Sequence, residues 1–135
     1  MLMRLRTTIA TLVLMLLILS TAFAADTFRC TECGMKVDIT SKFSAKTTQG
    51  DTTLYFCDIG DLFAYLKKHA VSDARIEVKD FTSGAWLDAR KAFYVHAEQK
   101  FSTPMGWGIA AFINKDDASK FGTAMDFDAA AKALK

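Results

Sequence analysis

The stretch that decides the fold is Tyr55-Phe56-Cys57-Asp58-Ile59-Gly60-Asp61, and a similar stretch follows 56 residues later as Ala111-Phe112-Ile113-Asn114-Lys115-Asp116-Asp117. Each places a phenylalanine at the end of an apolar run, an Asx residue two positions on, and an aspartate three positions beyond that. Asp58 and Asn114 are therefore predicted to cap two helices that follow strands. The match predicts a duplicated ββα unit, although unrelated strand–cap–helix junctions would also look alike.

The residues around the first junction predict a hairpin followed by a helix. Residues 42–56 alternate around Gln49-Gly50-Asp51, which is typical of two short strands joined by a turn. After Asp58, the helical positions Ile59, Leu62, Phe63 and Leu66 form one apolar stripe, with Asp61, Lys67 and Lys68 expected on the opposite face.

The rest of the chain alternates between predicted strands and helices. Strands are predicted over 75–80, 91–97 and 109–113, and helices over 115–123 and 126–134. The predicted class is α+β, with two related ββα-type halves and mixed or antiparallel strands.

The first 24 residues predict a secretory signal peptide. Arg4 and Arg6 precede an apolar run over 9–19, which is shorter than the roughly 20 residues of a membrane span. Ala22-Phe23-Ala24 supplies a small-x-small cleavage site, so cleavage is expected after Ala24 and the domain is expected to cover 25–135. The alternative is an uncleaved N-terminal anchor.

The charge of the chain argues against a nucleic-acid partner. The 135 residues include 17 Lys and Arg against 15 Asp and Glu, and two of the basic residues lie in the predicted signal peptide. The predicted mature domain is therefore close to neutral, and no basic patch is indicated.

The predicted mature domain opens with Cys30-Thr31-Glu32-Cys33-Gly34-Met35, which places three sulfur atoms within six residues. Thiolates and thioethers are the ligands that select Cu(I), whereas zinc has little use for a thioether. Gly34 would let the backbone fold tightly enough to bring Met35 toward the thiols. Three other readings remain open: a Cys30–Cys33 disulfide, a zinc ribbon that lacks a second ligand pair, and a thioredoxin-like redox site without its preceding strand.

A second sulfur-bearing feature is the loop Thr103-Pro104-Met105-Gly106-Trp107-Gly108. A methionine between proline and glycine is poorly explained as core filler, although a packing role for Met105 stays open. Met125 and Cys57 are interpreted as core residues, with a ligand role for Cys57 left open as the alternative, and His69 is interpreted as a helix C-terminal residue. His96 could reach a metal but is interpreted as an ordinary strand residue. No arrangement for nucleophilic catalysis stands out.

Together these stretches resemble the NosL family of nitrous-oxide-reductase accessory proteins, which are periplasmic copper chaperones. The matching stretches are residues 30–35, 55–66, 86–95 and 103–108. The resemblance implies an α+β domain of two related halves, similar to part of the organomercurial lyase fold. It also implies a Cys-x-Met metal element at Cys33 and Met35, with Met105 as a later ligand. Cys30 adds a thiol that only part of the family has.

The predicted function is that of a Cu(I)-binding metallochaperone, not an enzyme, with Cys30, Cys33, Met35 and Met105 as metal ligands. The implied partners are a copper-enzyme client and a membrane-bound maturation complex. Thr31 and Glu32 stand where denitrifier members carry a histidine, which leaves the client open. Ala25 follows the predicted cut in place of a lipobox cysteine, so a soluble periplasmic form is expected. The rival prediction is a thiol-disulfide oxidoreductase that uses Cys30 and Cys33.

Overall fold

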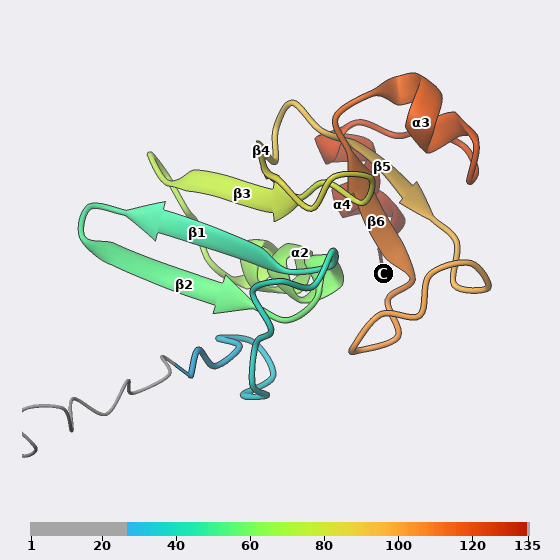
Figure 1. Ribbon diagram of the computed structural model, residues 1–135. Coiled ribbons are helices and arrows are strands. Elements are labelled where there is room, and N and C mark those ends of the chain that lie inside the picture. The colour runs from blue at the N-terminus through green and yellow to red at the C-terminus, as the bar shows by residue number, and fades with distance from the viewer. Residues whose placement is uncertain (1–26, 135) are drawn as a thin grey trace, which may run out of the picture.

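The computed structural model describes residues 27–134, so the predicted signal peptide lies outside the described residues. Figure 1 shows a four-stranded sheet beside a two-stranded one, with helices packed against them. No helix within 27–134 is long and apolar enough to cross a membrane. The predicted α+β class is confirmed.

The larger sheet has the strand order β2-β1-β3-β4, and every pairing in it is antiparallel. The predicted hairpin consists of β1 (Ala45–Gln49) and β2 (Thr52–Phe56), with Gly50 at φ +57° in the turn. β3 (Arg75–Lys79) pairs with β1 as a half-buried strand. The short edge strand β4 (Trp86–Asp88) was not predicted, because its three residues show no alternation of apolar and polar side chains.

The helix α2 (Ile59–Lys68) follows β2 as predicted, and the Asp58 side chain accepts a hydrogen bond from Gly60 N at 3.0 Å. Its apolar residues Ile59, Leu62 and Phe63 are buried. The expectation that Asp61 lies on the exposed face is wrong, because only 2% of this residue is accessible. The apolar stripe of α2 therefore does not explain the burial of Asp61.

The smaller sheet pairs β5 (Phe93–His96) with β6 (Ile109–Phe112) in antiparallel fashion. α3 (Lys115–Ser119) is shorter than predicted, and the Asn114 side chain makes no cap hydrogen bond to the backbone. α4 (Phe127–Ala133) begins after Asp126, whose side chain accepts from Ala129 N. Both helices pack against β5.

The two halves have equivalent hairpin–helix units, β1-β2-α2 and β5-β6-α3. After each helix the chain returns to the first strand of its hairpin: β3 pairs with β1, and Met125 forms a bridge with Tyr94 in β5. A parallel bridge also joins the segment before each unit to its second strand, Cys30 to Tyr55 and Asp80 to Ala111. Tyr55 and Ala111 are equivalent positions of the sequence repeat.

The segments that make these parallel bridges are equivalent turns. In the first turn, residues 30–35, Gly34 N donates to Cys30 O at 2.8 Å and Gly34 has φ +77°. In the second turn, residues 80–85, Gly84 N donates to Asp80 O at 2.8 Å and Gly84 has φ +75°. Both glycines occupy the left-handed region, which a side chain disfavours. The repeat therefore extends beyond the ββα unit to the turn that precedes it.

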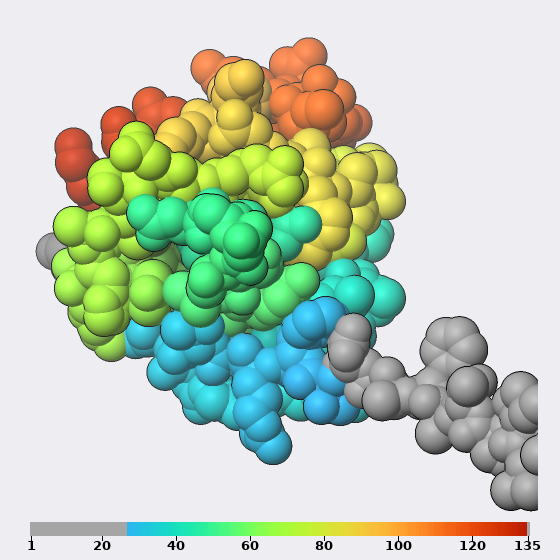
Figure 2. Space-filling view, turned by 90° about the vertical axis from the view of Figure 1, so that its left-hand side faces the viewer, coloured from blue at the N-terminus to red at the C-terminus, as the bar shows by residue number. Residues whose placement is uncertain are grey.

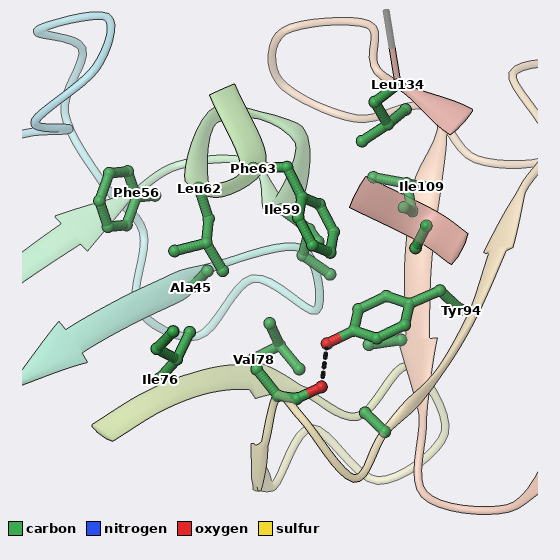
Figure 3. Close-up of a cluster of buried hydrophobic side chains, with 14 of the residues drawn as sticks. Ala45, Phe56, Ile59, Leu62, Phe63, Ile76, Val78, Tyr94, Ile109 and Leu134 are labelled. Carbon is green, nitrogen blue, oxygen red and sulfur yellow. Dashed lines mark hydrogen bonds between the residues drawn. The ribbon is translucent and has the colours of Figure 1, made fainter. Parts of the chain in front are cut away.

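The main core lies between α2, the larger sheet and the second half (Figure 3). Tyr94 reaches from β5 toward α2, and its ring contacts Phe63 at 5.5 Å between centroids. Its hydroxyl donates to Ala89 O at 2.6 Å. Figure 2, turned by 90° from Figure 1, shows the first described residues (blue) at the bottom of the view, below the residues of the β1–β2 hairpin.

We expect Tyr94→Phe to lower the free energy of unfolding by about 1–2 kcal/mol, because it leaves the buried Ala89 carbonyl without this donor. Urea denaturation under reducing conditions measures this as a lower midpoint with an unchanged m-value. Tyr65→Phe is the matched control at a half-buried tyrosine, with an expected change within about 0.5 kcal/mol. Equal losses for both variants would contradict the assignment.

Candidate metal site

Four metal-ligating side chains gather where the first turn meets the start of α2: Cys30, Cys33, Cys57 and Asp61. Their ligand atoms all lie within 4.8 Å of one another, and the three cysteines are free. We call this group the thiol cluster. It combines residues up to 31 positions apart in the chain.

The first turn supplies two of the thiols. Cys30 N donates to Met35 O at 2.7 Å, which closes the turn and returns the Met35 backbone to Cys30. Thr31 N donates to Tyr55 O at 2.9 Å and holds the turn on the edge of β2. Cys30 is 3% exposed, whereas Cys33 is half-buried. The turn thus places one thiol inside the protein and one near its surface.

The β2–α2 junction supplies the third thiol and the carboxylate. Cys57 directly follows β2, and its sulfur lies 3.4 Å from that of Cys33. Asp61 Oδ2 accepts from the Cys30 thiol at 3.3 Å and from the Cys57 thiol at 3.6 Å. Trp107 Nε1 donates to the other oxygen, Oδ1, at 2.8 Å. These hydrogen bonds explain why a carboxylate is buried at this point.

Burial raises the pKa of the Cys33 thiol to about 11, and it raises the pKa of Cys57 above its ordinary value as well. Desolvation disfavours the charged thiolate and is the main cause for both groups. Both thiols are therefore protonated at neutral pH, and a metal that binds them must displace protons.

The loop 103–108 is attached to the same helix start by buried carboxylates. Met105 N donates to Asp58 Oδ2 at 3.0 Å, and burial raises the pKa of Asp58. Trp107 packs so closely over Gly60 that a Cβ at residue 60 would lie 1.9 Å from the indole Cγ. A glycine is required there, and the loop lies beside the thiol cluster as a result.

The predicted ligands are brought together in part. Cys30 and Cys33 belong to the thiol cluster. Met35 and Met105 are joined to its surroundings through their backbones, and the two residues are 48% and 42% exposed. The interpretation of Cys57 as a core residue is confirmed for its burial, yet its sulfur also belongs to the cluster.

The sequence analysis preferred a core role for Cys57 over a ligand role, and it did not identify Asp61 as a member of the cluster. A signal was available in the repeat, because the second half carries Ile113 at the position of Cys57. The junction therefore does not require a thiol for its backbone conformation. His96 Nε2 lies 3.5 Å from Glu98 Oε1, and the ring of His69 stacks on that of Tyr65. Both histidines therefore have partners outside the thiol cluster.

Comparison with known proteins gives two findings. The NosL family model matches residues 22–128. The crystal structure of the copper chaperone NosL from Shewanella denitrificans is similar, with a TM-score of 0.65 and 24% identity, covering 76% of this chain and 88% of that one. A search of curated proteins gives no significant match.

The structural similarity supports the fold, including the α+β class expected from the sequence. The family match extends over both halves, from before the first turn to the start of α4. On the extent of this match, the chain belongs to the NosL family.

Proposed function

We propose that this protein is a metallochaperone that binds one copper ion as Cu(I) and delivers it to a copper enzyme. The observation that carries the proposal is the gathering of Cys30 and Cys33 with a third thiol, beside the backbones of Met35 and Met105. Sulfur ligands of both kinds favour Cu(I) over harder cations. The copper-chaperone function of the NosL protein of known structure supports the same conclusion.

The proposed ligands are Cys33, Met35 and Met105, with Cys30 as a fourth or exchange ligand. Met35 and Met105 are exposed residues, so a client can approach the site from their side. A site with an incomplete set of ligands suits a carrier, because a client's ligand can bind the copper before the carrier releases it. Backbone hydrogen bonds hold the segments that carry Met35 and Met105 in place. A client's ligand can therefore reach the copper from this side of the site.

The proposed location is the periplasm, with residues 1–24 as a signal peptide and 25–135 as the mature domain. The proposed client is a copper enzyme of the nitrous-oxide-reductase type, reached directly or through a membrane-bound maturation complex. The balanced charge of residues 25–135 fits a protein partner better than a nucleic acid.

The rival function, thiol-disulfide exchange by Cys30 and Cys33, is less well supported. A catalytic pair needs a thiol with a lowered pKa, whereas burial raises the pKa of Cys33. The Cys33 sulfur also lies 3.4 Å from that of Cys57, so the half-buried thiol has a sulfur neighbour outside the Cys-x-x-Cys pair.

Copper titration of the reduced protein against a Cu(I) chelator tests the proposed function. We expect the wild-type protein to compete for one copper equivalent. Cys33→Ser combined with Met35→Ala should weaken binding at least about 100-fold, since even the loss of a partner behind a metal ligand costs 10–100-fold. Met125→Leu is a control that removes a thioether from a packing position and should bind like wild type. Undiminished competition by the double variant would exclude the proposed site.

The pH dependence of alkylation separates the chaperone from the oxidoreductase. Because the pKa of Cys33 is raised to about 11, the thiolate fraction and the rate of iodoacetamide modification should keep rising from pH 7 to pH 10. Peptide mapping by mass spectrometry identifies the modified cysteine. A rate that levels off below pH 8 would indicate a lowered pKa and support the redox function.

A further inference from the structure

The internal repeat shows that three positions meet in both halves of the protein. They are the first residue of the turn, its fourth residue, and the residue just after the second strand of the hairpin. In the second half these are Asp80, Ser83 and Ile113.

In the second half the three positions are joined by hydrogen bonds alone. Asp80 Oδ2 accepts from Ser83 N at 2.9 Å and from Ser83 Oγ at 2.6 Å. Asp80 Oδ1 accepts from Ile113 N at 3.1 Å. A carboxylate and a hydroxyl are therefore sufficient to complete this meeting point, and the fold does not need sulfur there.

In the first half the same three positions are Cys30, Cys33 and Cys57, so each carries a thiol. Three thiolates around one metal ion, with bonds of about 2.3 Å, stand about 4 Å apart. The sulfurs of the thiol cluster lie within 4.8 Å of one another, and the Cys33–Cys57 pair is at 3.4 Å. This spacing suits three ligands around a common centre and is too short for a linear arrangement of Cys33 and Cys57.

Asp61 aligns the inner thiols, because its Oδ2 atom accepts hydrogen bonds from both Cys30 and Cys57. Trp107 holds the carboxylate through Oδ1, so the thiols point toward an oxygen in a defined position. The two sulfurs are thereby placed near each other before any metal arrives. Such an arrangement lowers the cost of ordering the ligands on binding.

Exposure decreases from the methionines to the inner thiols. Met35 and Met105 are 48% and 42% exposed, Cys33 is half-buried, and Cys30 and Cys57 are each 3% exposed. Cys33 is the one cysteine that is both accessible and in contact with Cys57. An ion that first binds at Cys33 would therefore find two further thiols on its inner side.

We propose that Cys57 is a third thiolate ligand, so that Cys30, Cys33 and Cys57 form an inner copper position behind the thioethers of Met35 and Met105. The inference rests on the proposed Cu(I) function and adds a ligand to it. Each thiol that binds Cu(I) releases its proton to water, and no electron is transferred. Cys33 belongs to both the outer and the inner position, and it is the ligand through which copper passes between them.

The test counts the sulfur neighbours of copper by X-ray absorption in the Met35→Leu/Met105→Leu variant, from which both proposed thioether ligands have been removed. We expect three sulfur neighbours in this background and two after Cys57→Ala is added. Cys57→Ala alone should weaken Cu(I) binding at least about tenfold, measured by chelator competition. Cys57→Ser tests the same ligand with a side chain of similar size, and its expected sulfur count is also two.

Ile113→Ala in the same double-methionine background is the matched control at the equivalent position of the second half, and its expected count stays at three. Circular dichroism and the thermal midpoint of the copper-free variants identify any loss of folding. Two sulfur neighbours both with and without Cys57 would overturn the third ligand while leaving the chaperone function intact. Absence of Cu(I) binding by the wild-type protein would overturn the proposed function as well.

Discussion

The site depends on two buried carboxylates at the start of α2, Asp58 and Asp61. A carboxylate removed from water is strongly destabilising unless hydrogen bonds replace its hydration. Asp58 obtains them from Gly60 N and Met105 N, and Asp61 from Trp107 Nε1 and two thiols. Because these donors come from three separate segments, satisfying the two carboxylates brings those segments together.

The duplicated architecture explains how such a site arises without a special fold. Both halves make the same glycine-containing turn, and in both a parallel bridge joins the first residue of the turn to the second strand of a hairpin. In the second half Asp80 fills the meeting point and stabilises it with hydrogen bonds to Ser83 and Ile113. In the first half thiols take these positions, and the carboxylate comes from the helix. One half therefore serves structure, and its counterpart has the donor atoms for a metal.

The proposed carrier function requires the protein both to hold its ion and to release it. The thiol cluster combines buried donors with a half-buried one, and the flanking residues Met35 and Met105 are exposed. Gly60 contributes to this arrangement, since the indole of Trp107 occupies the space where a side chain at residue 60 would lie. The loop that carries Met105 is thus held by packing as well as by hydrogen bonds, so the accessible side of the site keeps its shape without bound metal.

The sequence by itself determined the elements and the kind of chemistry. Alternation around Gly50 and the apolar stripe after Asp58 predicted the hairpin and helix correctly, because both patterns reflect local geometry. The sulfur-rich turn and Met105 indicated a soft-metal site by residue type alone. The membership of Cys57 and Asp61 was decided by the tertiary structure. Cys57 lies 24 residues after its partner Cys33 in the turn, and Asp61 lies 31 residues after its partner Cys30. Periodicity placed Asp61 on the exposed face, and only the packing of the turn and of Trp107 against α2 supplies the donors that make its burial possible.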